Sequence, residues 1–220
     1  MATIHTVHAN ESTARSRRRA AVLTWGTAAL ALLGATTASC SPPAEAALSV
    51  FTLGSPDLVA GTFPADTMLA SFGCHGHNRS PALSWSNAPA GTQRFAIQMI
   101  DLDAPTGSGF WHWAIYDLPG TATGLAGGAD ALPTPAIIGN TDFRDTGFFD
   151  TAIGYAGPCP PIGDKPHRYR ITLYAYTVPN LAQAGGIPVT GSAALYSFVL
   201  NKGLGDKLLG KTSLEATSRR

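Results

Sequence analysis

The sequence predicts a mainly β protein, an antiparallel β-sandwich with a few peripheral helices. Three observations support this fold class. Several short segments alternate large apolar residues with small or polar ones, which is the period of a β-strand. A helical pattern is convincing in one segment, residues 192–201. The 24 glycines and 16 prolines have no collagen-like period and therefore indicate many turns and long loops.

The strands follow from this alternation and from the turn residues that bound them. Phe95–Ile100 alternates as a half-buried strand does, and acidic residues follow it. Trp113–Leu118 is halted by Pro119-Gly120. The predicted strands, in chain order, are Ser49–Leu53, Ala82–Trp85, Phe95–Ile100, Trp113–Leu118 and Tyr169–Tyr176. In the last of these, the residues that share one face are Tyr169, Ile171, Leu173 and Ala175.

Two segments have helical spacing, and one long segment has no regular pattern. The predicted helix is Ser192–Asn201, with a weaker candidate at Val178–Ala184. The apolar side of the predicted helix Ser192–Asn201 consists of Ala194, Leu195, Phe198 and Val199. Residues 119–166 hold nine glycines and seven prolines and fit no element well. A loop of that length inside a compact domain is usually functional, so we expect it to border a site.

The charge balance separates a basic leader from a nearly neutral domain. Of 15 Lys+Arg and 14 Asp+Glu, residues 1–46 hold four arginines and two acids, which leaves 11 basic and 12 acidic residues in 47–220. A nucleic-acid-binding protein needs a basic stripe, so this class is excluded. The 45% hydrophobic content likewise excludes disorder. We expect a targeting segment at 1–46 and a single domain at 47–220.

The leader combines an arginine run with the uncharged stretch Ala20–Ala38, as an export signal does. Ala44-Glu45-Ala46 is an A-x-A cleavage pattern, which would release the chain into the periplasm or the medium. Thr37-Ala38-Ser39-Cys40 resembles a bacterial lipobox, in which case Cys40 would be lipidated and tether the chain to the membrane. The expected localisation is therefore periplasmic, secreted or lipid-anchored to the cell envelope.

The predicted domain contains two cysteines, Cys74 and Cys159, if Cys40 belongs to the leader. In an oxidising compartment the two thiols can pair as a disulfide. The residues alone leave two alternatives open. Both cysteines could be buried free thiols, or they could form a zinc site with His75 and His77, although the C-x-x-C spacing of such sites is missing.

Chemistry-bearing residues gather in three segments. Asp101-Leu102-Asp103-Ala104-Pro105 follows a strand, and two carboxylates at i and i+2 on a strand would share a face. His112 lies between Trp111 and Trp113, whose indoles we expect to shield it. His167 and Tyr169 point to the same side of a strand and follow the rigid Gly157–Pro161 loop. An anion pocket of imidazolium, phenol and loop N–H donors is the simplest interpretation.

Five motifs occur together in one order along the chain: Ser80–Trp85, Asp101–Pro105, His112-Trp113, Gly157–Pro161 and His167–Tyr169. In this combination the chain resembles the phosphatidylethanolamine-binding protein family, in its bacterial Raf-kinase-inhibitor-like (YbhB/YbcL) branch. The resemblance implies a two-sheet β-sandwich with a pocket for phosphate, acetate or a phosphoethanolamine headgroup. It also favours a Cys74–Cys159 disulfide, because cysteines at these places are usual in that branch.

The resemblance assigns roles to the candidate residues. Asp101 and His112 would form the polar floor of the pocket, while Asp103 and Pro105 would shape the adjoining turn. Gly157 and Pro158 would form one rim. The opposite wall would consist of His167 and Tyr169. Leu102 stands where the family commonly has proline, and the C-terminal helix that covers the pocket in eukaryotic members has no clear counterpart in Lys211–Arg220.

The leading functional hypothesis is a non-catalytic binding protein for small anionic or phospholipid-headgroup ligands, without cofactor or metal. An interaction protein that modulates kinases or proteases through its surface is the alternative, and a phosphoester hydrolase is the least favoured. No G-x-S-x-G, H-E-x-x-H, P-loop or dinucleotide motif is present. A homodimer remains open, and the sequence identifies neither the physiological ligand nor a protein partner.

Overall fold

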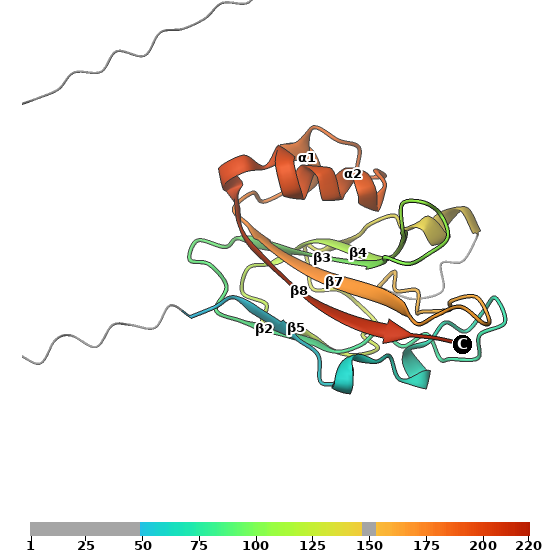
Figure 1. Ribbon diagram of the computed structural model, residues 1–220. Helices are drawn as coiled ribbons and strands as arrows, with labels where there is room; N and C mark the ends of the chain where they lie inside the picture. The colour runs from blue at the N-terminus through green and yellow to red at the C-terminus, as the bar shows by residue number, and fades with distance from the viewer. Residues whose placement is uncertain (1–48, 147–152) are drawn as a thin grey trace, which may run out of the picture. The chain divides into compact units, whose positions relative to one another are not determined.

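The computed structural model describes residues 49–146 and 153–220, which form two antiparallel sheets packed face to face (Figure 1). The predicted cleavage motif and Cys40 lie outside these residues. The larger sheet has the order β6-β4-β3-β7-β8 and the smaller one the order β1-β2-β5. The predicted antiparallel β-sandwich is therefore confirmed. Among the described residues, no helix is long and apolar enough to cross a membrane.

The smaller sheet has only short strands, whereas the larger sheet has four long strands and the two-residue β6. The smaller sheet consists of β1 (Thr52–Gly54), β2 (Leu83–Ser86) and β5 (Gly124–Leu125). The larger sheet consists of β3 (Arg94–Asp101), β4 (Phe110–Pro119), β6 (Ile137–Ile138), β7 (His167–Tyr176) and β8 (Leu208–Ser218). Each of the five predicted strands overlaps one of these. Strands β5 and β6 lie within the loop predicted at 119–166.

Helices cover the outer face of the larger sheet (Figure 1). They are α1 (Leu181–Gly185) and α2 (Ala193–Phe198), the latter continued by a π-helical turn at Val199–Gly203. The side chains of Asn180 and Ser192 cap them by accepting hydrogen bonds from backbone N–H groups of the first turn. Single turns of 3₁₀-helix occur at Val59–Gly61, Ala65–Thr67, Asp142–Thr146 and Gly205–Lys207. Both predicted helices therefore exist, each shorter than expected.

The apolar side predicted for Ser192–Asn201 is correct for Val199, which is buried, but wrong for Ala194, Leu195 and Phe198, which are exposed. Leu195 and Phe198 are 37% and 63% exposed, whereas Tyr196 and Leu200 are fully buried. The Tyr196 ring stacks on the ring of Tyr116 in β4, with 3.9 Å between centroids. This contact rotates the helix so that its tyrosine rather than its more apolar residues faces the sheet.

The C-terminal segment forms no covering helix, in agreement with the expectation for Lys211–Arg220. It forms a long edge strand instead, β8, which was not predicted and which pairs with β7 from Tyr176↔Leu208 to His167↔Ser218. Its outward residues Lys211, Ser213 and Glu215 are polar and exposed. Charged residues of this kind protect an edge strand from pairing with another chain.

The larger sheet is buried on both faces at its centre. One face of β3 and β7 packs with β2 in the sandwich core. The four residues of β7 that were predicted to share a face all belong to this core: Tyr169, Ile171, Leu173 and Ala175. The other face packs under the helices, and Asp117 fixes that layer by accepting hydrogen bonds from the Tyr176 hydroxyl at 2.9 Å and the Leu181 N–H at 3.0 Å. Phe95–Ile100 is thus fully rather than half buried along most of its length, because helices cover its second face.

Cys74 and Cys159 form a disulfide across 85 residues, with 5.9 Å between their Cα atoms. The pairing expected from the family resemblance is therefore confirmed. The free-thiol and zinc-site alternatives are wrong, because each sulfur is bonded to the other. The bridge joins the loop before β2 to the loop before β7.

Removing this bridge should lower the stability substantially. We expect Cys74→Ser combined with Cys159→Ser to reduce the free energy of unfolding by about 4 kcal/mol, the loop-closure value for a ring of this size. Urea denaturation of the variant and of the oxidised parent measures the difference. The parent treated with a reductant is the matched control and should unfold like the variant; equal midpoints for variant and oxidised parent would contradict the prediction.

Candidate functional site

The polar candidate residues meet where the central strands of the larger sheet end. Asp101 is the last residue of β3, and it pairs with Tyr169 of β7 on one side and with Phe110 of β4 on the other. His167 begins β7, two residues before Tyr169. These residues point to the inner face, as the period-two alternation of β7 predicts.

His112 reaches the same place through a β-bulge. Met99 pairs with Trp113 and Ile100 with Trp111, so His112 is the extra residue of β4. A bulge re-aims a side chain that regular alternation would send elsewhere. The ring of His112 consequently lies among other rings, with centroid distances of 5.5 Å to Phe110, 5.0 Å to Phe143 and 5.2 Å to Tyr169. The shielding by neighbouring indoles that we expected is therefore wrong.

These side chains line a cavity of about 180 Å³. Its polar members are Asp101, His112, His167, Thr106 and the Tyr169 hydroxyl. Its apolar members are mostly rings: Phe72, Phe110, Phe143, Pro105, Pro160 and Pro161, together with Ala104 and Cys159. The cavity is thus small and largely apolar, with a few convergent polar groups, which is the usual composition of a small-molecule site.

Asp101 and His167 form a buried ion pair. The His167 Nδ1 lies 2.8 Å from Asp101 Oδ2, and its Nε2 lies 3.2 Å from Asp164 Oδ2. Burial disfavours the cation, but the hydrogen bonds and charges of the two carboxylates outweigh it and raise the pKa of His167. Because carboxylates only accept, both ring nitrogens carry protons and the group is an imidazolium. Asp101 Oδ1 also accepts from the Asp103 N–H at 2.9 Å.

His112 is held in the neutral form. Burial lowers its pKa to about 4, against the smaller opposing effect of its hydrogen bond to Ala156. The Ala156 carbonyl oxygen lies 2.9 Å from Nδ1 and can only accept, so Nδ1 carries the proton and Nε2 keeps a lone pair. Among the described residues, none bonds Nε2.

The Tyr169 hydroxyl is the unsatisfied polar group of the cavity. The side chain is fully buried, and its oxygen makes no hydrogen bond of ordinary geometry within residues 49–146 and 153–220, although the Asp101 carboxylate is near enough to accept a weak one. Burial, followed by the negative charge of Asp101, raises the pKa of this phenol, so it remains a donor. A buried donor without an acceptor costs about 1–3 kcal/mol, which a ligand with an acceptor atom would recover.

Not every predicted residue lines the cavity. Asp103 lies beside it and accepts three hydrogen bonds from Arg168, from Nε and the backbone N–H at 2.9 Å each and from Nη2 at 3.1 Å, while Lys165 lies at 3.2 Å. These contacts hold the pKa of Asp103 well below its usual value. The carboxylates of Asp101 and Asp103 therefore do not act as a facing pair. Strand β3 ends at Asp101, so the strand alternation on which that expectation rested does not extend to Asp103.

Gly157 and Pro158 support the cavity from behind. The Gly157 N–H donates to Asn78 Oδ1 at 2.7 Å, and the Pro158 carbonyl accepts from the Leu69 N–H at 3.1 Å. A Cβ on Gly157 would collide with the Thr67 carbonyl oxygen, so this position excludes every larger residue. The residues that reach the cavity from this loop are Cys159, Pro160 and Pro161.

Sequence reasoning missed several residues of the site. Phe110 was detectable, because it lies two residues before His112 on the same strand. Asp164 precedes His167 by three residues, but its role depends on how the loop folds back. No sequence pattern marks Phe143 as a site residue, because it lies in the 3₁₀-helical segment Asp142–Thr146 inside the irregular stretch 119–166.

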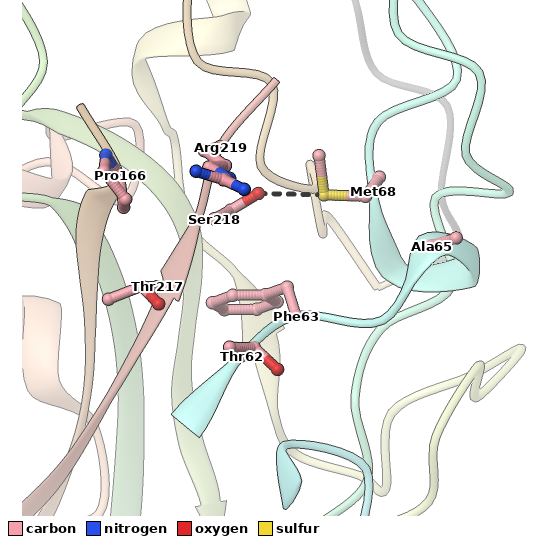
Figure 2. A pocket seen from close by; sticks show the side chains of 8 residues that line it. All are labelled: Thr62, Phe63, Ala65, Met68, Pro166, Thr217, Ser218 and Arg219. Atoms are coloured by element: carbon pink, nitrogen blue, oxygen red, sulfur yellow. Dashed lines mark hydrogen bonds between the residues drawn. The ribbon is translucent and has the colours of Figure 1, made fainter. Parts of the chain in front are cut away.

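Figure 2 shows a larger cavity, of about 530 Å³. The Phe63 ring lines it and touches the Tyr169 ring edge-on, with 5.4 Å between centroids. Arg219 is the charged residue of its lining, and Ser218 contacts Met68 there. Since this cavity has no cluster of titratable groups, the chemistry is concentrated in the smaller one. Within the described part of the chain, no group of three or more His, Cys, Asp or Glu could hold a metal ion.

Comparison with known proteins agrees with this geometry. The family model for the phosphatidylethanolamine-binding protein matches residues 60–216. The chain is 42% identical over 139 residues to the UPF0098 protein YbcL of Escherichia coli, covering 61% of this chain and 70% of the relative. It is 35% identical over 164 residues, 73% of this chain and 72% of the relative, to LppC of Mycobacterium tuberculosis, which is named as a candidate lipoprotein.

A solved structure supports the same assignment. The crystal structure of E. coli YbcL, described as a new member of the mammalian PEBP family, matches with a TM-score of 0.64 and 33% identity, over 77% of this chain and 98% of that one. The family match spans nearly all described residues. The chain belongs to the phosphatidylethanolamine-binding protein family.

Proposed function

We propose that the protein is an exported, non-catalytic binding protein whose cavity holds a small phosphate-type or other anionic headgroup. The observation that carries this proposal is the fully buried hydroxyl of the cavity-lining residue Tyr169, a donor that makes no hydrogen bond of ordinary geometry among the described residues. An oxygen of a phosphate or carboxylate group would accept its hydrogen bond. The aromatic and proline lining excludes water and strengthens that bond.

The electrostatics of the cavity favour a ligand that still carries a proton. Asp101 alone would repel an anion, but the His167 imidazolium neutralises it at 2.8 Å. The neutral His112 offers an acceptor at Nε2, so it pairs with a ligand P–O–H or takes up a proton when a ligand binds. A monoanion with one hydroxyl complements this set better than a fully ionised phosphate does.

The competing enzymatic interpretation finds less support in the lining. Two of the described lining residues carry an aliphatic hydroxyl or a sulfur atom of the kind that serves as a nucleophile, and both are already engaged. Thr106 donates its hydroxyl hydrogen to the Gly109 carbonyl, and Cys159 is bonded to Cys74. A hydrolase of this kind would need a nucleophile beside a base. Modulation of a kinase or protease through the surface remains the alternative of a different class, and no described feature favours it.

Substitutions in the cavity should weaken phosphate binding. We expect Tyr169→Phe and His112→Ala to lower the affinity for phosphoethanolamine and for inorganic phosphate about tenfold each, the effect of one lost hydrogen bond in a dry site. Isothermal titration calorimetry measures both ligands, which separates recognition of the phosphate from recognition of the whole headgroup.

Tyr174→Phe is the matched control, because Tyr174 is also buried in β7 but faces the opposite side of the sheet. Unchanged affinity in His112→Ala and Tyr169→Phe would refute the proposal. Release of phosphate from an ester substrate, abolished by Asp101→Asn, would establish a hydrolase instead.

Binding should also weaken as the pH rises from about 5.5 to 8. A phosphate monoester loses its second proton near pH 6, which removes the hydrogen that neutral His112 can accept. Above its raised pKa, His167 loses its proton and leaves Asp101 as an uncompensated negative charge, so both effects have the same sign. Calorimetry at a series of pH values measures this trend. Sulfate, which has no proton to lose in this range, should bind weakly throughout; if it bound as well as phosphate at low pH, the protonation argument would be wrong.

Export is proposed from the leader and from the naming of LppC as a candidate lipoprotein. We expect the chain produced in a bacterial host to lack its first residues. Mass spectrometry of the N-terminus should find either a lipidated Cys40 or a start at Ala47. Cys40→Ser distinguishes the two, since it should abolish membrane attachment only if Cys40 is the anchor. An intact N-terminus in the cytoplasmic fraction would refute export.

A further inference from the structure

A second concave surface lies on the opposite face of the strands that build the first site. Asp101 and Tyr169 line the inner cavity, and their neighbours Ile100 and Arg170 line a groove on the outer face. The groove has a volume of about 510 Å³, within the roughly 300–1,000 Å³ usual for small-molecule sites. It lies beside helix α2, which covers part of the same face (Figure 1).

The floor of the groove consists of two cross-strand rows. In one row Ile100 pairs with Trp111 on one side and with Arg170 on the other. In the next, Gln98 pairs with Thr172, which in turn pairs with Ser213. The first row gives a half-buried aromatic and aliphatic surface, and the second gives an amide and two hydroxyl groups.

Gln98 supplies the observation that points to a ligand. Its side chain is 1% exposed, and its Nε2 donates to the Ala193 carbonyl at 2.9 Å and to the Tyr116 hydroxyl at 3.1 Å. Because the carbonyl of Ala193 can only accept, the amide cannot be turned over. Its Oε1 is then a buried acceptor, and no described residue donates to it. A ligand with an O–H or N–H group would satisfy this oxygen.

The charges of the groove restrict the ligand class. Arg170 and Glu215 neutralise each other at 2.7 Å, while Lys211 donates to Asn201 Oδ1 at 2.7 Å and leaves one net positive charge. That charge disfavours a cation, and the unpaired acceptor of Gln98 disfavours a fully ionised anion. Neutral ligands that donate and accept hydrogen bonds remain, together with anions that keep a hydroxyl group, and the uncharged row of Gln98, Thr172 and Ser213 favours the neutral class.

We propose that this groove is a second binding site, for a neutral saccharide. A sugar ring has an apolar C–H face, which fits the surface of Trp111 and Ile100, and an edge of hydroxyl groups, which fits the row of Gln98, Thr172 and Ser213. This site is independent of the phosphate site, since the two occupy opposite faces of β3 and β7.

Saturation-transfer NMR on the full-length chain tests the proposal with glucose, N-acetylglucosamine and maltose as probes. We expect transfer to the ring protons of at least one probe, and a shift of the Trp111 indole N–H resonance. Trp111→Leu and Ser213→Ala should each lower the affinity of that probe about tenfold. Ser84→Ala, an exposed serine of β2 in the other sheet, is the matched control and should leave the affinity unchanged.

Gln98→Leu removes the unpaired acceptor itself and should abolish saccharide binding. Because this variant also loses the bonds to Ala193 and Tyr116, its fold is checked by its phosphate affinity, which should remain normal. Should it fail to fold, Trp111→Leu and Ser213→Ala decide the question alone. Absence of transfer to all three saccharides would overturn the proposal. Binding that survives both exposed-groove substitutions would overturn it as well.

Discussion

Burial of β3 on both faces is the constraint on which the rest of the molecule depends. The strand has β4 on one side and β7 on the other, with the sandwich core beneath it and the helical layer above it. Its backbone groups are satisfied by these neighbours, so the strand can be buried along nearly its full length. Successive side chains of β3 therefore point alternately into the sandwich core and toward the helical layer. Asp101, the last residue of the strand, places its carboxylate at the end of the sandwich core.

That carboxylate explains the organisation of the phosphate-type site. A buried charge requires a partner, and His167 supplies one at 2.8 Å while Asp164 keeps the imidazole protonated from its other side. The pair leaves the cavity close to neutral, so hydrogen-bonding capacity rather than net charge must select the ligand. The Tyr169 donor and the His112 acceptor are complementary groups, and together they describe a ligand that both accepts and donates.

The same alternation gives the larger sheet two functional faces. Even-numbered residues of β3 and β7, such as Gln98 and Arg170, lie opposite Asp101 and Tyr169. The short helix α2 covers only part of the outer face, and the uncovered part is polar. The two proposed sites can therefore coexist on opposite faces of the same strands, provided that these strands keep their register.

The sequence patterns located five strands, both helices, and four of the five polar residues that line the cavity, but few of its apolar ones. They missed β8, because small residues such as Thr212 and Ala216 give weak alternation. They misplaced the buried face of α2, where the stacking of Tyr196 on Tyr116 outweighs the greater hydrophobicity of Phe198. These errors have a common cause, since each depends on a partner distant in the sequence.

The sequence by itself determined the fold class, the family, and the identities of Asp101, His112, His167 and Tyr169, because local alternation and ordered motifs are written in neighbouring residues. Only the tertiary structure decided how these residues act. The bulge that aims His112, the burial that keeps it neutral, and the pairing of Asp101 with His167 across 66 positions all arise when strands meet. The protonation state and the hydrogen bonds of a side chain depend on the groups around it. For His112 and Asp101 these groups come from segments that are distant in the sequence.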